Sequence, residues 1–555
     1  MTRRLVRALV LVVLPAALAS LAWRCQPSWD GPARPPAAIR GFVLNADGPL
    51  GGATVRIQAT DSVTVSGADG SFALRAGAGT AATVTAWFAG HYIGHAEVTP
   101  GGTPVVITLE RHYTTDNESY TWFSSENAEG SKSCGHCMPG HYEEWKGDAH
   151  ALAARNPRFL SMYNGTDVKG NRSPVTRYGQ DRDYGRFPLG PDPNRPYYGP
   201  GYKLDFPDTA GNCAACHVPG AAASLGRQFQ ADVNRLDRFE KEGIFCDFCH
   251  KVGEVTLDPA TGLPFWSTPG VLSMRLYRPK EGQQLFFGTF DDVTRRVTYL
   301  PLLRESTFCA PCHWGVFWGV LVYNSYGEWL ESPYSDPNTG KTCQDCHMPV
   351  TKDEWFVRPE RGGLRRRPGG IFRHRMPGAS DVALLRDTAK VQVRAKRRGD
   401  RIVAAVRVTN EKAGHHIPTD HPARNILLVV SAVDAGGRRL EHVGKQVLPP
   451  WAGEGKEPDD YAGRPGKGYA KILEELWTET SPTAAYWRQT VLRKDTRIPA
   501  LATDVTHYEF RAPTGRQRVT VRAKLLFRRA FKKLARQKKW PRKDILMEDE
   551  KATVP

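Results

Sequence analysis

Cysteine, methionine and long hydrophobic runs are all scarce in this 555-residue chain. There are 11 cysteines and 7 methionines, and no apolar stretch beyond the N-terminus is long enough to span a membrane, which excludes a multi-span membrane protein. Acidic residues are outnumbered, with 58 Asp and Glu against 76 Lys and Arg. Hydrophobic (40%) and charged (24%) contents are those of a globular protein with real cores. The length predicts about three or four domains.

The N-terminus has the pattern of an export signal. Three arginines within the first seven residues precede an apolar run from Ala8 to Leu21, in which Ala17-Leu18-Ala19 offers small residues for cleavage. An uncleaved membrane anchor is the alternative, because the run is only slightly shorter than a spanning helix. We therefore predict that residues 1–24 are a signal peptide or anchor, and that the mature protein lies on the periplasmic or extracellular side.

Ten of the few cysteines form five pairs with two residues between their members. The pairs are Cys134/Cys137, Cys213/Cys216, Cys246/Cys249, Cys309/Cys312 and Cys343/Cys346, and the last four are followed at once by His217, His250, His313 and His347. This C-x-x-C-H pattern is the attachment signature of c-type haem. The two thiols add to the porphyrin edge, and the next residue places its imidazole under the iron. Disulfides and zinc ribbons fit the paired cysteines but not the four histidines at one position.

The first pair departs from this pattern, since it reads Cys134-Gly-His136-Cys137-Met138. Three interpretations are open. A haem is attached with Met138 or a remote histidine on its iron, and a thioether ligand would raise its potential. Alternatively, the haem has an open axial site for small-molecule chemistry, or the pair is a disulfide. The chain is therefore expected to carry four or five haems c.

Six-coordinate iron also needs distal ligands, and 12 of the 16 histidines lie outside the C-x-x-C-H motifs. His150 follows an apparently helical segment, and His374 follows an Arg- and Gly-rich loop. His415 and His416 lie in a turn between two strand-like runs. We predict His150, His374 and one of His415 and His416 as distal ligands, with His141 as a further candidate. The histidines predicted to lie on the surface are His91, His95, His421, His442 and His507.

Hydrophobic alternation predicts a multidomain fold. Short alternating runs separated by turn residues predict a small β-sandwich over residues 36–111. Residues 112–379 hold all five cysteine pairs and are expected to form a mainly α-helical and irregular multihaem domain. Strand-like runs return over residues 386–528 and predict a C-terminal β-sandwich. Residues 529–555 are predicted to be a basic tail, and Lys524 to Lys543 has the apolar spacing of an amphipathic helix.

Several segments resemble known families. Residues 36–111 resemble the carboxypeptidase-regulatory-like domain through Gly51-Gly52-Ala53-Thr54-Val55 and Asp69-Gly70-Ser71-Phe72, which implies an accessory or docking module. Residues 130–378 resemble the multihaem cytochromes related to the tetrahaem electron acceptor of hydroxylamine oxidoreductase. That resemblance rests on Tyr142-Glu143-Glu144-Trp145 with His150, Gly243 to Lys251, Glu328 to Tyr334 and Cys343 to Pro349. It also rests on residues 414–419, Gly-His-His-Ile-Pro-Thr, which we call the Gly414 loop.

This second resemblance implies close-packed haems with two histidine ligands each and an electron-transfer role. Met138 is a departure, because the family has histidine there. The odd first motif followed by four C-x-x-C-H motifs is also similar to the pentahaem cytochrome c nitrite reductases, whose odd motif carries lysine.

Two main functions are therefore expected. The first is an electron relay in a respiratory chain between a redox donor and an acceptor, which are acidic or membrane-bound partners given the net charge of +18. The second is a reductase or oxidase of a small nitrogen or sulfur compound, acting at the Cys134/Cys137/Met138 haem. A structural subunit of a membrane redox complex is a weaker alternative. Nucleic acid is not an expected partner, because the protein is exported and its basic residues are spread out.

Overall fold

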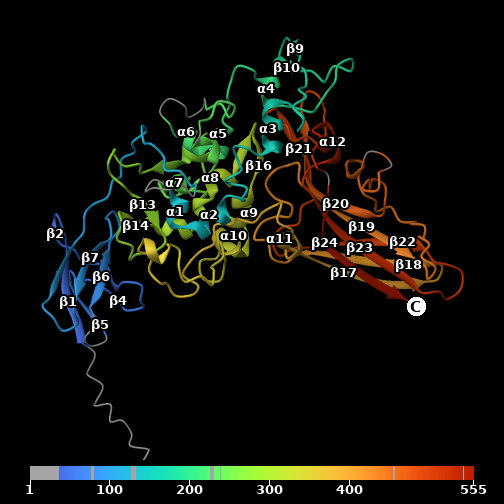
Figure 1. Cartoon of the computed structure of the whole chain (residues 1–555). Helices are drawn as coiled ribbons and strands as arrows, with labels where there is room; N and C mark the ends of the chain where they lie inside the picture. The colour runs from blue at the N-terminus through green and yellow to red at the C-terminus, as the bar shows by residue number, and fades with distance from the viewer. Residues whose placement is uncertain are drawn as a thin grey trace, which may run out of the picture.

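The computed structural model describes residues 37–76, 81–126, 133–224, 231–237, 239–453, 455, 457–541 and 543–555. The predicted signal peptide or anchor lies outside these residues. Figure 1 shows strands at both ends of the chain and a middle region of short helices and loops between them. The chain is mixed, with many β-sheets and few, short helices, and this agrees with the multidomain layout predicted from the sequence. None of the helices in the described ranges is long and apolar enough to cross a membrane.

Two four-stranded sheets pack face to face near the N-terminus. One has the order β2-β1-β5, with β8 pairing in parallel with β1, and the other has the order β4-β3-β6-β7. Alternate residues point into a shared apolar core, as the period of a strand requires. The strands are β1 (Ala37–Asn45), β2 (Gly48–Pro49), β3 (Thr54–Ile57), β4 (Val63–Val65), β5 (Ser71–Ala76), β6 (Ala82–Trp87), β7 (Gly94–Val98) and β8 (Val105–Thr108).

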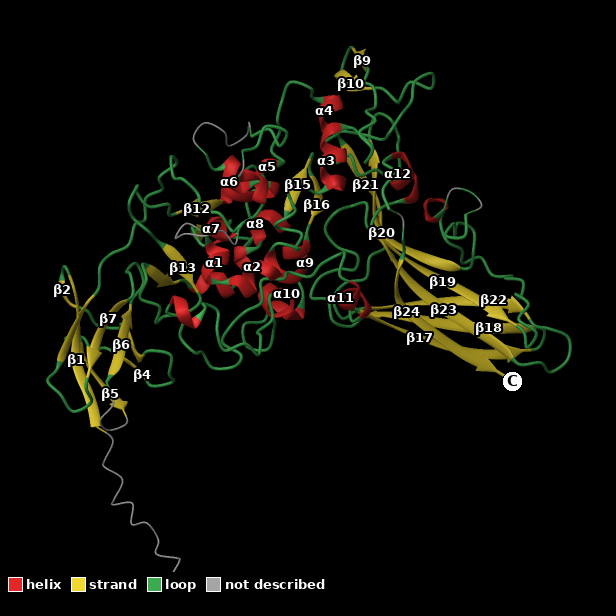
Figure 2. Ribbon diagram, viewed as in Figure 1, coloured by secondary structure: helices red, strands yellow, loops and turns green. Residues whose placement is uncertain are grey.

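The middle region consists of short helices and two-stranded sheets joined by loops (Figure 2). Its helices are α1 (Cys134–Cys137), α2 (Pro139–Trp145), α3 (Pro157–Asn164), α4 (Tyr202–Asp205), α5 (Ala214–His217), α6 (Pro219–Ala222), α7 (Cys246–Cys249), α8 (Ala310–His313), α9 (Ser325–Leu330), α10 (Cys343–His347) and α11 (Val382–Arg386). Its strands are β9 (Tyr178–Asp181), β10 (Gly185–Pro188), β11 (Val252–Val255), β12 (Met274–Leu276), β13 (Phe286–Gly288), β14 (Val297–Tyr299), β15 (Gly315–Phe317) and β16 (Val320–Tyr323). Every cysteine pair coincides with one of these helices.

Longer strands form two sheets at the C-terminal end, in the orders β17-β18-β22 and β21-β20-β19-β23-β24. Their facing side chains make a large buried core that includes Val391, Ile402, Leu428 and Val521. The elements are β17 (Ala389–Arg398), β18 (Arg401–Asn410), β19 (Asn425–Val433), β20 (Gly466–Glu475), β21 (Thr490–Asp495), β22 (Thr503–Arg511), β23 (Val519–Arg528), α12 (Lys532–Gln537) and β24 (Ile545–Val554).

The prediction of a basic tail over residues 529–555 is wrong. Residues 545–554 form β24, which pairs antiparallel with β23 along its whole length, from Ile545 opposite Phe527 to Val554 opposite Val519. Met547 and Val554 belong to the buried core. The helix predicted from Lys524 to Lys543 is also wrong over most of its length, because Phe527 lies in β23 and only residues 532–537 are helical.

Ion pairs and a hydrogen bond join both β regions to the middle of the molecule. On the N-terminal side, Arg56 contacts Asp291 at 3.0 Å, and the Asp292 carboxylate accepts from the Ala59 amide at 2.8 Å. On the C-terminal side, Arg488 bridges to Asp205 at 2.8 Å. The N-terminal contacts are half-buried and the Arg488–Asp205 pair is buried, and these directional contacts help to fix where each β region lies against the region that holds the cysteine pairs.

Candidate functional site

The ten paired cysteines all line one cavity of about 1450 Å³ in the middle region. Its lining is mainly apolar and aromatic. It extends to the C-terminal strands, where it meets Ile426 and Phe527, and to Gln58 of the N-terminal strands. Its volume exceeds the roughly 300–1,000 Å³ of ordinary small-molecule sites. The cavity therefore has room for large apolar groups rather than for a single small ligand.

Each cysteine pair forms one tight helical turn. In three motifs, the amide of the histidine donates to the carbonyl oxygen of the first cysteine, which brings both thiols and the imidazole to one side of the turn. Met138 makes the same bond in the first pair, so its backbone occupies the place of the motif histidine. The N···O distances are 3.0 Å for Met138 to Cys134, 3.0 Å for His217 to Cys213, 3.1 Å for His250 to Cys246 and 3.2 Å for His313 to Cys309.

The five turns lie against one another rather than at separate places. The thiol groups of Cys134 and Cys246, of Cys216 and Cys312 and of Cys309 and Cys343 lie close enough to shift one another's pKa. The first motif therefore neighbours the third, and the fourth neighbours both the second and the fifth. Cys249 of the third motif in turn interacts electrostatically with Cys309 and Cys312 of the fourth, so groups attached at these cysteines would form a continuous path.

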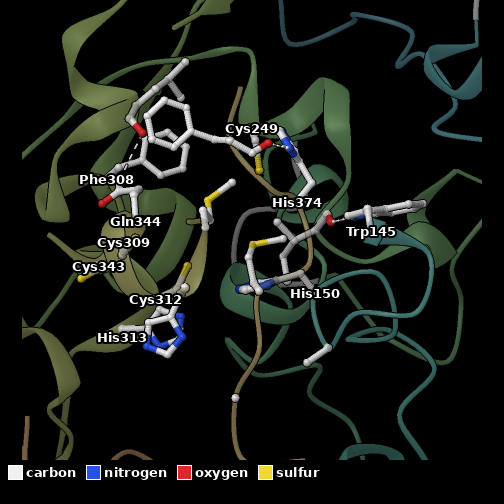
Figure 3. Close-up of a pocket in the computed structure, with 18 of the residues that line it drawn as sticks. Trp145, His150, Cys249, Phe308, Cys309, Cys312, His313, Cys343, Gln344 and His374 are labelled. Carbon is white, nitrogen blue, oxygen red and sulfur yellow. Dashed lines mark hydrogen bonds between the residues drawn. The ribbon is translucent and has the colours of Figure 1, made fainter. Parts of the chain in front are cut away.

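Three histidines from elsewhere in the chain face motif histidines across the cavity. Metal–imidazole bonds are about 2.0–2.1 Å, so two rings on opposite sides of one metal have centres about 6.2–6.5 Å apart. The observed separations fit this span, and Figure 3 shows His150, His313 and His374 among the cysteine sulfurs. The ring centres are 6.2 Å apart for His150 and His313, 6.5 Å for His250 and His374, and 6.4 Å for His347 and His415.

Hydrogen bonds at Nδ1 orient the motif histidines. His250 donates to the Phe287 carbonyl at 2.5 Å, and His347 donates to the Pro377 carbonyl at 2.7 Å. A carbonyl can only accept, so these rings keep Nε2 unprotonated and free to bind a metal. Burial lowers the pKa of both His217 and His347 to about 4, which favours the neutral, ligating form. The donor set therefore fits covalently attached haem.

The two adjacent histidines of the Gly414 loop point in different directions. His415 lines the cavity. The His416 amide instead donates to the Glu328 carboxylate at 3.1 Å, and its Nδ1 lies 3.7 Å from the same group. Of the two predicted alternatives, only His415 is therefore placed to face a motif histidine.

Two other predicted residues also line the cavity. Met138 follows the first cysteine pair into the cavity wall. The His141 ring lies against His374, with ring centres 4.4 Å apart. His141 is thus a neighbour of a distal candidate, and the structure does not place it across from a motif histidine.

Sequence reasoning missed a cluster beside the second cysteine pair. His421 was predicted to lie on the surface, but it lines the cavity, where burial lowers its pKa to about 3. Its ring lies 6.3 Å from Tyr323 and 5.9 Å from Tyr486, and the two tyrosine rings are 5.1 Å apart. His91 is buried as well, among the N-terminal strands. In the sequence, the one sign that His421 lies at the cavity is that it closely follows the Gly414 loop.

His217, the motif histidine of this second pair, has different surroundings from the other three. Its ring stacks on Phe159, with centres 3.8 Å apart. Within the described ranges, no histidine ring faces it at the separation seen in the three pairs. Burial and the neighbouring tyrosine raise the pKa of Tyr323 well above its usual value, so this hydroxyl keeps its proton.

Comparisons with known proteins bear on the fold alone. No protein-family model matches the chain, and no curated protein matches it. Among solved structures, it is similar to a penta-heme cytochrome c552 from Thermochromatium tepidum, with a TM-score of 0.50 and 21% identity over 76% of this chain and 97% of that chain. The structural-genomics target SoR45 matches with a TM-score of 0.14 and 7% identity, over 30% of this chain and 88% of that one. That likeness is too weak to carry an argument.

Proposed function

We propose that this chain is an exported multihaem c-type cytochrome, which relays electrons through five covalently attached haems in a respiratory chain. The observation that carries the proposal is the shared cavity, in which five attachment turns neighbour one another and three histidine pairs have the spacing that one iron requires. Bound haem supplies one-electron transfer. The fold shared with a penta-heme cytochrome supports the same conclusion.

The chain's own residues would attach, orient and enclose the haems. The cysteines of each motif would form the thioether bonds, and His217, His250, His313 and His347 would be proximal ligands. His374, His150 and His415 would bind opposite His250, His313 and His347 respectively. Hydrogen bonds at Nδ1 would hold the imidazoles in place, and the apolar lining would keep water from the porphyrins.

The backbone of the first motif supports a fifth haem there. Cys134, Cys137 and Met138 form the same closed turn as the histidine motifs, and all three line the cavity. Met138 would then be the proximal ligand, and its thioether would give this haem a higher potential than a haem with two histidine ligands.

The experiment is a haem count on the exported protein, by intact mass and by a haem assay. We expect five haems in the wild type and four in the double variant Cys134→Ser/Cys137→Ser, with Cys25→Ser as the control that keeps five. Four haems in the wild type would remove the first haem from the proposal. No covalent haem would contradict the function as a whole.

Reduction or oxidation of a small nitrogen or sulfur compound is the second candidate function. We first expected this chemistry at the Met138 haem, but the surroundings of His217 favour the second motif. There, Tyr323 and Tyr486 lie beside Cys213 and supply buried, protonated hydroxyls. No described histidine ring lies at the paired separation from His217, although His421 is near enough to interact with it electrostatically. Carbon monoxide binding to the reduced protein tests this candidate, and its loss in Cys213→Ser/Cys216→Ser would assign the site. A relay whose irons are all six-coordinate would bind none.

Redox partners with acidic surfaces suit the relay, because the net charge is +18. Electron exchange with such a partner should slow as salt is added, since salt screens the attraction. Association at the membrane through residues 1–24, and a role as a structural subunit of a membrane complex, are further proposals. Copurification with membrane proteins would support them.

A further inference from the structure

One motif histidine donates to a carboxylate where others donate to the backbone. His313 Nδ1 lies 3.2 Å from the Asp420 carboxylate oxygen Oδ2. His250 and His347 donate to the carbonyls of Phe287 and Pro377. Asp420 comes from the loop that precedes β19 in the C-terminal region, so a distant part of the chain supplies this contact.

The loop around Asp420 is held firmly in place. Asp420 has a φ of +65°, a left-handed conformation that is strained for a residue with a Cβ and persists only where its surroundings impose it. The preceding Thr419 hydroxyl donates to the buried Glu328 carboxylate at 2.6 Å, and Arg424 donates to the Thr419 carbonyl at 3.1 Å. The Asp420 side chain is only 16% exposed, so little water screens its charge from His313.

We propose that Asp420 lowers the reduction potential of the haem attached at Cys309 and Cys312 below that of the haems bound by His250 and His347. The inference deepens the proposed function and depends on it. A carboxylate that accepts the Nδ1 proton gives the ring more anionic character than a carbonyl does. The more basic ring stabilises ferric iron over ferrous iron, so the haem becomes harder to reduce.

The position of this haem gives the effect a consequence for the relay. The fourth motif neighbours both the second motif, through Cys216 and Cys312, and the fifth, through Cys309 and Cys343. An electron that moves from one side of the cavity to the other through these motifs passes the Cys309/Cys312 haem. A low potential at this haem makes electron transfer to it the uphill step of that path. Asp420, which belongs to the C-terminal region, would set the size of that step.

The ring planes make this haem identifiable. His150 and His313 are crossed at 73°, whereas the other two pairs are inclined at 22° and 14°. Crossed imidazole planes leave two iron d orbitals nearly equal in energy, which gives an oxidised low-spin haem a strongly anisotropic electron paramagnetic resonance signal. That signal can be followed during a potentiometric titration of the whole holoprotein.

Asp420→Asn tests the proposal, because it keeps an acceptor of similar shape and removes the charge. We expect the crossed-plane signal to titrate at a higher potential, with the reduction equilibrium shifted about tenfold or more, or about 59 mV for each tenfold in a one-electron couple. Asp420→Glu keeps the charge and should stay near the wild type. Asp434→Asn is the matched control, since Asp434 is buried in the same β region against Arg438 and does not line the cavity.

An unchanged potential of the crossed-plane haem in Asp420→Asn would overturn the inference while leaving the relay intact. An equal shift of the haems with parallel planes would overturn it as well. His150, the other ring of this pair, also donates to a buried carboxylate, that of Asp148, at 2.9 Å, so the wild-type potential alone does not separate the two carboxylates. If Asp420→Asn does not fold, Asp420→Ser is the second variant, because it also removes the charge and keeps a short polar side chain, and the same rise in potential is expected. A holoprotein without haem at Cys309 and Cys312 would instead contradict the proposed function itself.

Discussion

Two adjacent side chains, His415 and His416, have opposite surroundings. The first lines the cavity opposite His347, and the second rests on Glu328. We predict that His415→Ala removes the sixth ligand of one haem and converts it from low spin to high spin, whereas His416→Ala leaves every haem low spin. Absorption and electron paramagnetic resonance spectra of the oxidised proteins measure this. A high-spin haem in the His416 variant would contradict the assignment.

A buried ion pair beside the first and third motifs gives a stability prediction. Lys251 and Asp247 lie 2.5 Å apart with both side chains fully buried, and Asp247 also accepts from the Phe123 amide at 2.8 Å. Asp247→Ala leaves the buried Lys251 ammonium group without its carboxylate partner, so we expect the free energy of unfolding to fall by about 3–5 kcal/mol. Denaturant unfolding followed by circular dichroism tests this.

The matched control for that experiment is Glu143→Ala. It breaks the exposed Lys146–Glu143 pair on α2 and should cost only about 0–1 kcal/mol. If the two variants lost equal stability, burial of the ion pair would not be the cause.

At the level of elements, β24 is the largest departure from the sequence prediction, and it carries a measurable part of the core. Met547 is 4% exposed and packs in the interior of the C-terminal sheets. We expect Met547→Ala to lower the free energy of unfolding by about 2–5 kcal/mol, through lost burial and the cavity left behind. The exposed Lys551 on the same strand is the control, and Lys551→Ala should change stability by less than about 0.5 kcal/mol. Equal effects would mean that β24 is frayed in solution.

What could be predicted from the sequence depended on how local the cause was. The turns that hold the cysteine pairs could be predicted because both cysteines and the histidine of each motif lie within one helical turn. The β24 strand could not be predicted because four consecutive residues of its ten, Glu548 to Lys551, are charged, and because its pairing with β23 is a tertiary contact. The place of His421 beside the second motif depends on a contact with a distant segment, and no spacing rule encodes it. The choice between His415 and His416 needed the position of Glu328.

At the scale of the whole molecule, the strands of the two ends lie on opposite sides of the middle region that holds the cysteine pairs (Figure 1). Asp292 joins the N-terminal strands to the middle, since it accepts from the Ala59 amide and pairs with the buried Arg366 at 2.6 Å. We predict that Asp292→Ala loosens this junction and speeds proteolytic release of the N-terminal strands. Limited proteolysis followed by mass spectrometry measures it.

The control for the junction is Asp47→Ala, which breaks only the exposed Arg111–Asp47 pair. It should leave the rate of cleavage unchanged. Cleavage that is equally fast in the wild type and in Asp292→Ala would show that this carboxylate does not hold the two parts together.

The Gly414 loop also sets an order of assembly. His415 reaches His347 only when Asn410, at the end of β18, donates to the His415 carbonyl at 2.8 Å and to the Ile498 carbonyl at 3.2 Å. Under the proposed function, a haem at Cys343 and Cys346 could be attached as soon as its own turn had been exported, whereas His415 would reach it only after the C-terminal strands had folded. The completed ligand set of that haem would then report that the whole chain has matured, and a half-made protein would be spectroscopically distinct from a finished one.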